Sequence, residues 1–75
     1  MDERMNRRIS RYMFKKRKKK MMSRGDVVKV TGLSLNTVKN IENIEFTGGM
    51  NINTLKLLCE CYDTTLSRMF KFLKL

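Results

Sequence analysis

Two groups of side chains in this sequence could recognise a polyanion. Residues 15–20 read KKRKKK, six cations with no acid between them. The segment 36–43 holds three asparagines, Asn36, Asn40 and Asn43. Cations attract phosphate groups or an anionic membrane surface, and an asparagine amide can pair with two atoms on the edge of an adenine base. The residues available therefore suit the recognition of charge and of hydrogen-bonding edges.

Residues for covalent chemistry are scarce. The chain has no histidine, and Cys59 and Cys61 are its two thiols. One chain therefore cannot assemble a four-ligand zinc site or a histidine-based proton relay. The two cysteines would lie about 200° apart around a helix, which disfavours a shared metal site or an internal disulfide, and Cys59 is expected in the core. We expect no enzyme, no catalytic residues, no cofactor and no metal.

Length and composition favour one small folded domain. The chain has 75 residues, of which 41% are hydrophobic and 32% charged, enough apolar content for a small helical core. The N-terminus has no signal-peptide pattern, and no apolar run approaches the length of a membrane span. We expect a cytoplasmic protein without a membrane partner.

The positive charge is concentrated at the N-terminal end. Residues 1–24 hold eleven Lys or Arg against Asp2 and Glu3, which is +9 of the total net charge of +10. Such a segment favours salt-dependent binding of DNA, RNA or an acidic membrane. It is also typical of a solvated helix face or a frayed tail, so charge alone names only a class of partner.

The spacing of apolar residues predicts a helix over 9–20, with Ile9 and Met13 on one face. Six consecutive residues cover every direction around a helix, so part of the basic run must face the core. Arg17 follows Met13 by four positions on the apolar face. A buried guanidinium needs a carboxylate partner, and the residues by themselves do not say which.

Capping signals predict two further short helices. Ser23 and Asp26 resemble a capping box for a helix over 24–31, and Gly32 is suited to the left-handed conformation after its end. Ser34 is the N-cap candidate for a helix running to about Asn43.

Two more helices are predicted in the C-terminal third. One follows the loop at 44–49, and a break at 63–65 separates it from the last helix. The fold class is therefore all-α, with five short helices.

Residues 23–43 form a helix-turn-helix pattern. Val38 and Ile41 give the second of its helices a narrow apolar stripe, as a helix that enters a DNA groove requires. Its outward positions are small or polar: Leu35, Asn36, Thr37, Lys39, Asn40 and Asn43. The alternative, a plain solvated helix, is less favoured because asparagine is a poor helix former.

These residues resemble the lambda-repressor and Cro-like helix-turn-helix family, also called the XRE family, over residues 9–73. The likeness rests on the unbroken spacing of Val28, Gly32, Val38 and Ile41. It implies a compact five-helix DNA-binding domain at residues 9–75, with a helix-turn-helix at about 23–43. It also implies that Glu42 is the buried partner of Arg17.

The same resemblance implies a set of DNA contacts. Base-edge contacts would come from Leu35, Asn36 and Asn40. Phosphate contacts would come from Arg24, Lys39, Asn43, Lys18, Lys19 and Lys20. Two departures from the family pattern are Met21, where a glycine often ends the first helix, and a longer loop after the third helix. Residues 1–8 extend beyond the pattern, either as a basic arm along the DNA or as a disordered leader.

The resulting hypothesis is a small dimeric repressor, from a phage, plasmid or mobile element, that binds a palindromic DNA operator. The last helix has more apolar residues than one face can hide, which marks Met69, Phe72 and Leu75 as candidates for a homodimer interface; the alternative is a helix that folds back on the core. Two other functions stay open: an antitoxin or anti-repressor interaction module, and a non-specific nucleic-acid or membrane binder that uses the basic segment.

Overall fold

The computed structural model describes residues 3–46 and 48–74, and within them the chain forms five helices and no strand. The helices are α1 (Glu3–Lys19), α2 (Arg24–Thr31), α3 (Leu35–Glu42), α4 (Ile52–Cys61) and α5 (Leu66–Phe72). The all-helical class predicted from the sequence is confirmed. The predicted loop at 44–49 and the break at 63–65 fall between helices as expected, and Thr47 lies outside the described residues.

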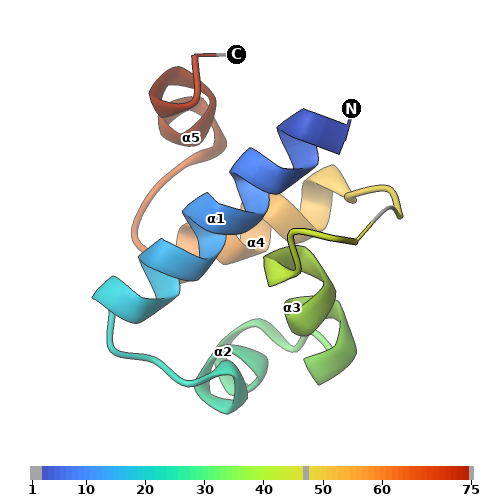
Figure 1. Cartoon of the computed structure of the whole chain (residues 1–75). Helices are drawn as coiled ribbons and strands as arrows, with labels where there is room; N and C mark the ends of the chain where they lie inside the picture. Colours follow the sequence, from blue (N-terminus) through green and yellow to red (C-terminus); the bar gives the residue numbers. More distant parts are fainter. Residues whose placement is uncertain (1–2, 47, 75) are drawn as a thin grey trace.

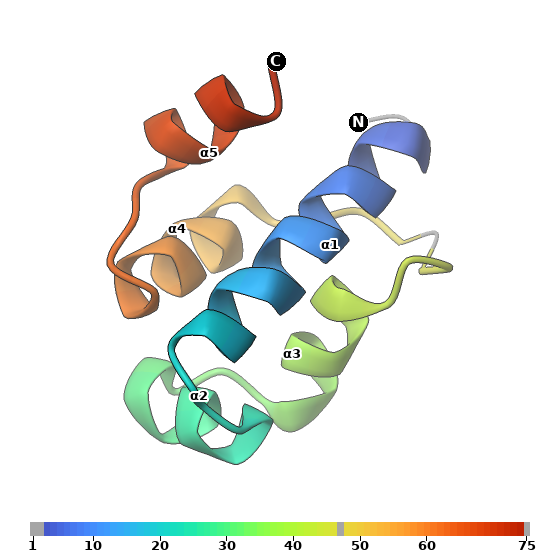
Figure 2. The ribbon, with the colours of Figure 1, turned by 60° about the vertical axis from the view of Figure 1, so that its left-hand side comes forward.

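The helices pack around one core. α1 crosses the middle of the molecule, with α2 and α3 toward one end and α5 at the opposite end (Figures 1 and 2). α3 packs against α1 and α2, while α4 contacts both α2 and α5. The largest fully buried side chains are Ile9, Met13, Val27, Val38, Leu55, Leu58, Cys59 and Met69. Each of the larger aliphatic residues stabilises the fold by about 1.5–3 kcal/mol through burial.

α1 begins six residues earlier than predicted. Residues 3–8, expected to be an arm or a disordered leader, form its first turns, and residues 1 and 2 lie outside the described part. Asn6 and Ser10 are buried on the same face as Ile9, and Met5 packs against the core. Because two of these positions are polar, the apolar pattern did not reveal that the buried face continues.

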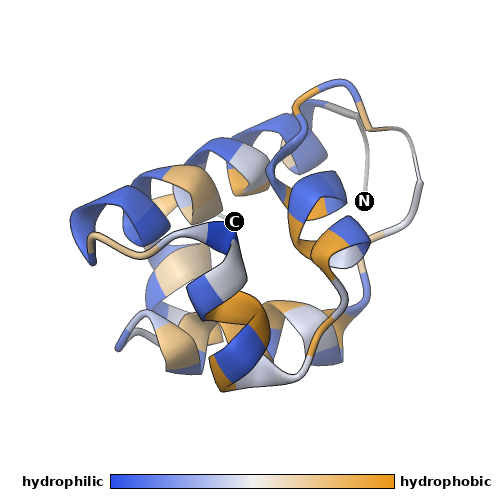
Figure 3. Cartoon of the chain, turned by 90° about the horizontal axis from the view of Figure 1, so that it is seen from below, coloured by the Kyte–Doolittle hydropathy of each residue, from blue (hydrophilic) through white to orange (hydrophobic). Residues whose placement is uncertain are grey.

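Most of α1 is hydrophilic, with a few hydrophobic residues interspersed (Figure 3). Its length is 17 residues. None of the helices in the described part of the chain combines the length and the apolar character needed to cross a membrane.

Met21 ends α1 in a left-handed conformation, with φ of 56°. The amide of Met21 donates to the carbonyl of Lys18 at 2.9 Å, and the amide of Met22 donates to that of Arg17 at 3.2 Å. This bond pattern is a Schellman motif, which usually has glycine at the left-handed position. A residue with a Cβ atom therefore occupies the left-handed position of this turn.

Replacing Met21 by glycine should stabilise the protein. Met21→Gly removes the clash of Cβ with the following carbonyl and loses little burial, because the side chain is 91% exposed. We expect the free energy of unfolding to rise by about 1 kcal/mol, measured by urea denaturation followed by circular dichroism. Met21→Ala is the matched control, since it keeps Cβ. An equal gain in both variants would contradict the conformational explanation.

Candidate nucleic-acid interface

The start of α2 is fixed by a capping box at Ser23. The Ser23 hydroxyl accepts from the amide of Asp26 at 3.0 Å, and the Asp26 carboxylate accepts from the amide of Ser23 at 2.9 Å. The hydrogen bond from the Ser23 amide to the ionised carboxylate is the main cause that lowers the pKa of Asp26. The position of Arg24, the first residue of the helix, is thereby determined.

The turn between α2 and α3 is held by backbone geometry and one threonine. Gly32 adopts φ of 76°, the left-handed conformation that glycine allows at no steric cost. The Thr31 hydroxyl donates to the carbonyl of Val27 at 2.7 Å and accepts from the amide of Leu33 at 3.2 Å. Ser34 then caps α3 by accepting from the amide of Thr37 at 3.1 Å. The two helices are joined by a short turn that these hydrogen bonds hold.

α3 is anchored by one narrow face. Val38, Ile41 and Glu42 are its buried residues. Leu35 is 45% exposed, Asn36 and Lys39 are exposed, and Asn40 is half-buried beside them. A helix with one narrow buried stripe can project its remaining face into a groove of DNA about 12 Å wide.

The Glu42 carboxylate lies between two arginines from other helices. Arg17 of α1 donates from Nε to Oε2 at 2.7 Å and from Nη2 to Oε1 at 3.1 Å. Arg24 of α2 donates from Nε to Oε1 at 3.1 Å. The side chains of Arg17 and Glu42 are 6% and 2% exposed. The partner that the resemblance implied for Arg17 is thus in place, joined by a second cation from α2.

Burial and ion pairing shift the pKa values of two side chains around Glu42. Its hydrogen bonds raise the pKa of Arg17, whose Nη1 also donates to the carbonyl of Met22 at 2.9 Å. Burial, together with the nearby Glu42 charge, raises the pKa of Tyr62. Arg17 therefore stays protonated and Tyr62 stays neutral over the physiological range.

The end of α1 and the first turns of α2 and α3 meet in one shallow hollow. Four residues predicted to contact DNA line it, namely Lys18, Arg24, Leu35 and Lys39. The sequence places these residues on three helices, and the fold brings them to one surface. This surface offers cations for phosphates next to an apolar residue that can meet a thymine methyl group.

A comparison with known protein families shows the family of this chain. The model of the Cro/C1-type helix-turn-helix DNA-binding domain matches residues 8–72 of this chain. The chain belongs to the Cro/C1-type helix-turn-helix family. No curated protein and no solved structure matches it. The family resemblance inferred from the sequence is therefore confirmed, and the Cro/C1-type domain occupies most of the chain.

Three residues predicted to contact phosphate lie outside the hollow of the Cro/C1-type domain. Lys20, predicted to contact phosphate, forms an exposed ion pair with Asp63. Lys19 lines a different groove, between α1 and α5. Asn43 is the C-cap of α3, and its Oδ1 accepts from the amide of Glu45 at 2.9 Å. The long-range contact of Lys20 could not be read from local spacing.

The predicted homodimer interface of the Cro/C1-type domain requires a correction. Met69 is fully buried in the core and cannot contact a second copy, because the inward face of α5 packs on the rest of the domain. Phe72 is 73% exposed. Leu75 lies outside the described residues. Phe72 is thus the one described member of the predicted set that is accessible.

Sequence reasoning missed the second role of Arg24 and the groove around Phe72. Arg24 was assigned to phosphate alone, whereas it also pairs with Glu42. Local spacing carried no signal for this contact, because Arg24 and Glu42 are 18 positions apart. The groove had no sequence signal, because α1 and α5 are distant in the chain.

Removing the charge of Glu42 should destabilise the domain strongly. Glu42→Gln leaves the buried Arg17 without a counter-charge, so we expect the free energy of unfolding to fall by about 3 kcal/mol or more. Thermal and urea unfolding followed by circular dichroism measure this change. Glu60→Gln, an exposed change on α4, is the control and should have little effect. Equal effects of the two changes would show that the ion pair does not hold α3.

Proposed function

We propose that this Cro/C1-type domain is a sequence-specific transcriptional regulator that reads duplex DNA through α3 and acts as a dimeric repressor. The observation that carries the proposal is the arrangement of α3. Its buried stripe and Glu42 fix the helix to the core, while Leu35 and Asn36 face outward beside the cations of α1 and α2.

In this proposal the polar face of α3 reads bases. Asn36 and Asn40 would pair with adenine edges, and Leu35 would contact a thymine methyl group. Asn40 is half-buried.

The phosphate contacts are proposed for the cations that border the hollow. Lys39 would reach the backbone from α3 and Lys18 from the end of α1. Arg24 is held by Glu42 while 40% of its side chain remains exposed. This pairing would orient the Arg24 guanidinium at the start of α2, where the helix dipole also favours a phosphate. Lys19, Lys20 and Asn43 do not line the hollow and would contribute less.

Two copies would bind a palindromic operator, one on each half-site. Half-sites one DNA turn apart, about 34 Å, place two recognition helices in successive major grooves. Phe72 is surrounded by cations of α1 and α5, so pairing of two free copies there would bring like charges together. We therefore propose that the dimer forms on the DNA. A cytoplasmic location and an origin in a phage, plasmid or mobile element are part of the same proposal.

Alanine at Asn36 or Asn40 should weaken specific binding. Each change removes a bidentate base contact, so we expect a loss of about 1–3 kcal/mol on the cognate sequence and little change on unrelated DNA. Asn53→Ala, an exposed asparagine at the start of α4, is the matched control. Gel-shift titration with both DNAs measures the difference. Equal losses on both DNAs would contradict base reading by these side chains.

Selection from random duplex DNA should yield a palindrome. At about 150 mM salt, where non-specific binding is weak, we expect half-sites about 10 base pairs apart. Sedimentation should show a monomer without DNA and two copies on the selected duplex. Lack of any enriched sequence, with binding that disappears as salt rises, would contradict a specific regulator and favour the interaction module or the non-specific binder.

A further inference from the structure

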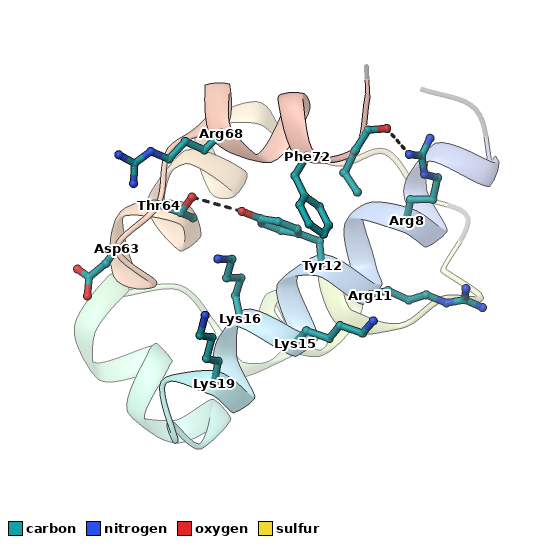
Figure 4. A pocket seen from close by; sticks show the side chains of 11 residues that line it. Arg8, Arg11, Tyr12, Lys15, Lys16, Lys19, Asp63, Thr64, Arg68 and Phe72 are labelled. Carbon is teal, nitrogen blue, oxygen red and sulfur yellow. Dashed lines mark hydrogen bonds between the residues drawn. The ribbon is translucent and has the colours of Figure 1, made fainter.

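A groove between α1 and α5 lies apart from the outward face of α3 (Figure 4). It has a volume of about 630 Å³, within the usual range of small-ligand sites. Six cationic side chains line it: Arg8, Arg11, Lys15, Lys16, Lys19 and Arg68. The one acid among its lining residues, Asp63, already pairs with Lys20. The groove therefore has a large excess of positive charge.

The exposed aromatic side chain of Phe72 lines the same groove as these cations. Phe72 is 73% exposed, and its ring centroid lies 5.5 Å from that of Tyr12 at a tilt of 51°. Tyr12 is buried, and its hydroxyl lies 3.3 Å from the Thr64 hydroxyl in a hydrogen bond. The buried tyrosine thus supports one side of Phe72 and leaves much of the phenylalanine ring available for contact with a planar group.

The cations are arranged along the groove and on both of its sides. Arg11, Lys15 and Lys19 follow one another at every fourth residue of α1, about 6 Å apart along the helix. Arg68 lines the groove from α5, and Figure 4 shows its guanidinium directed to the side opposite to that of Arg11 and Lys15. The guanidinium of Arg8 donates to the carbonyl of Leu73, which ties α1 to the end of α5. This hydrogen bond connects the α1 side of the groove to the end of α5.

We propose that this groove binds a nucleotide with an unpaired base. The base would stack on Phe72, and the phosphate would lie among the cations that line the groove. Aromatic stacking beside a cationic track is the usual way in which proteins hold single-stranded nucleic acid. A duplex does not fit this chemistry, because its base faces are covered by neighbouring base pairs. The nucleotide can belong to a single strand or be free in solution.

Two other occupants fit less well. A carboxylate-rich peptide would use the cations but has no need of an exposed ring at their centre. A second copy of this chain would bring another six cations against the first six. Binding of a carboxylate-rich peptide is one of the outcomes that the test distinguishes.

Fluorescence anisotropy with a labelled single strand of about eight thymidine nucleotides, at about 150 mM salt, tests the proposal. Phe72→Ala should raise the Kd about tenfold, because one stacking contact is lost. Phe14→Ala is the matched control. Phe14 is on α1, is exposed like Phe72, and lies near the cations Arg17 and Lys18, but it does not line the groove. It should leave the Kd unchanged.

A second pair of variants tests the charge. Arg68→Ala should weaken single-strand binding several-fold, whereas Lys71→Ala, on the same helix and outside the groove lining, should change it less. Circular dichroism of every variant checks that the fold is retained. Competition by a nucleoside triphosphate at micromolar concentration would identify a free nucleotide as the ligand, and its failure to compete would identify a single strand.

Three results would overturn the proposal. They are an unchanged Kd in Phe72→Ala, an equal loss in Phe14→Ala, or binding of an oligoglutamate of the same charge as tight as that of the single strand. Asn40→Ala should leave single-strand binding intact, and Phe72→Ala should leave binding of the selected duplex intact. A failure of the proposed duplex recognition through α3 can therefore be distinguished from a failure of the proposed nucleotide groove.

Discussion

The carboxylate of Glu42 joins the helix-turn-helix to the rest of the domain. It is almost completely buried and receives hydrogen bonds from Arg17 of α1 and Arg24 of α2. A buried charge is costly unless its partners meet it with good geometry, so α1, α3 and the start of α2 must adopt one arrangement around it. The direction in which α3 presents its outward side chains depends on this contact.

The basic run 15–20 is divided by helix geometry into different roles. Successive residues point about 100° apart, so Arg17 faces the core while Lys18 borders the hollow beside α3. Lys19 turns toward α5, and Lys20 pairs with Asp63. One uninterrupted charge run thereby contributes to the ion pair, to the candidate duplex surface and to the groove.

The parts of the fold with local signals could be predicted from the sequence. α2 and α3 have capping serines and Gly32, which act within four residues, and their bounds agree closely with the expected ones. The start of α1 could not be predicted, because Asn6 and Ser10 occupy buried positions where the pattern requires apolar residues. The burial of Met69 was also missed, since an amphipathic helix does not reveal which apolar residues the remaining helices will cover.

The sequence by itself determined the helical class, the helix-turn-helix and the residue types on the outward face of α3, because periodicity and capping act over short distances along the chain. Tertiary structure decided which cations are neutralised and which face an open surface. Arg24 meets Glu42 across 18 positions and Lys20 meets Asp63 across 43. The groove between α1 and α5 was likewise decided only by packing, since no local pattern specifies which distant side chains become neighbours.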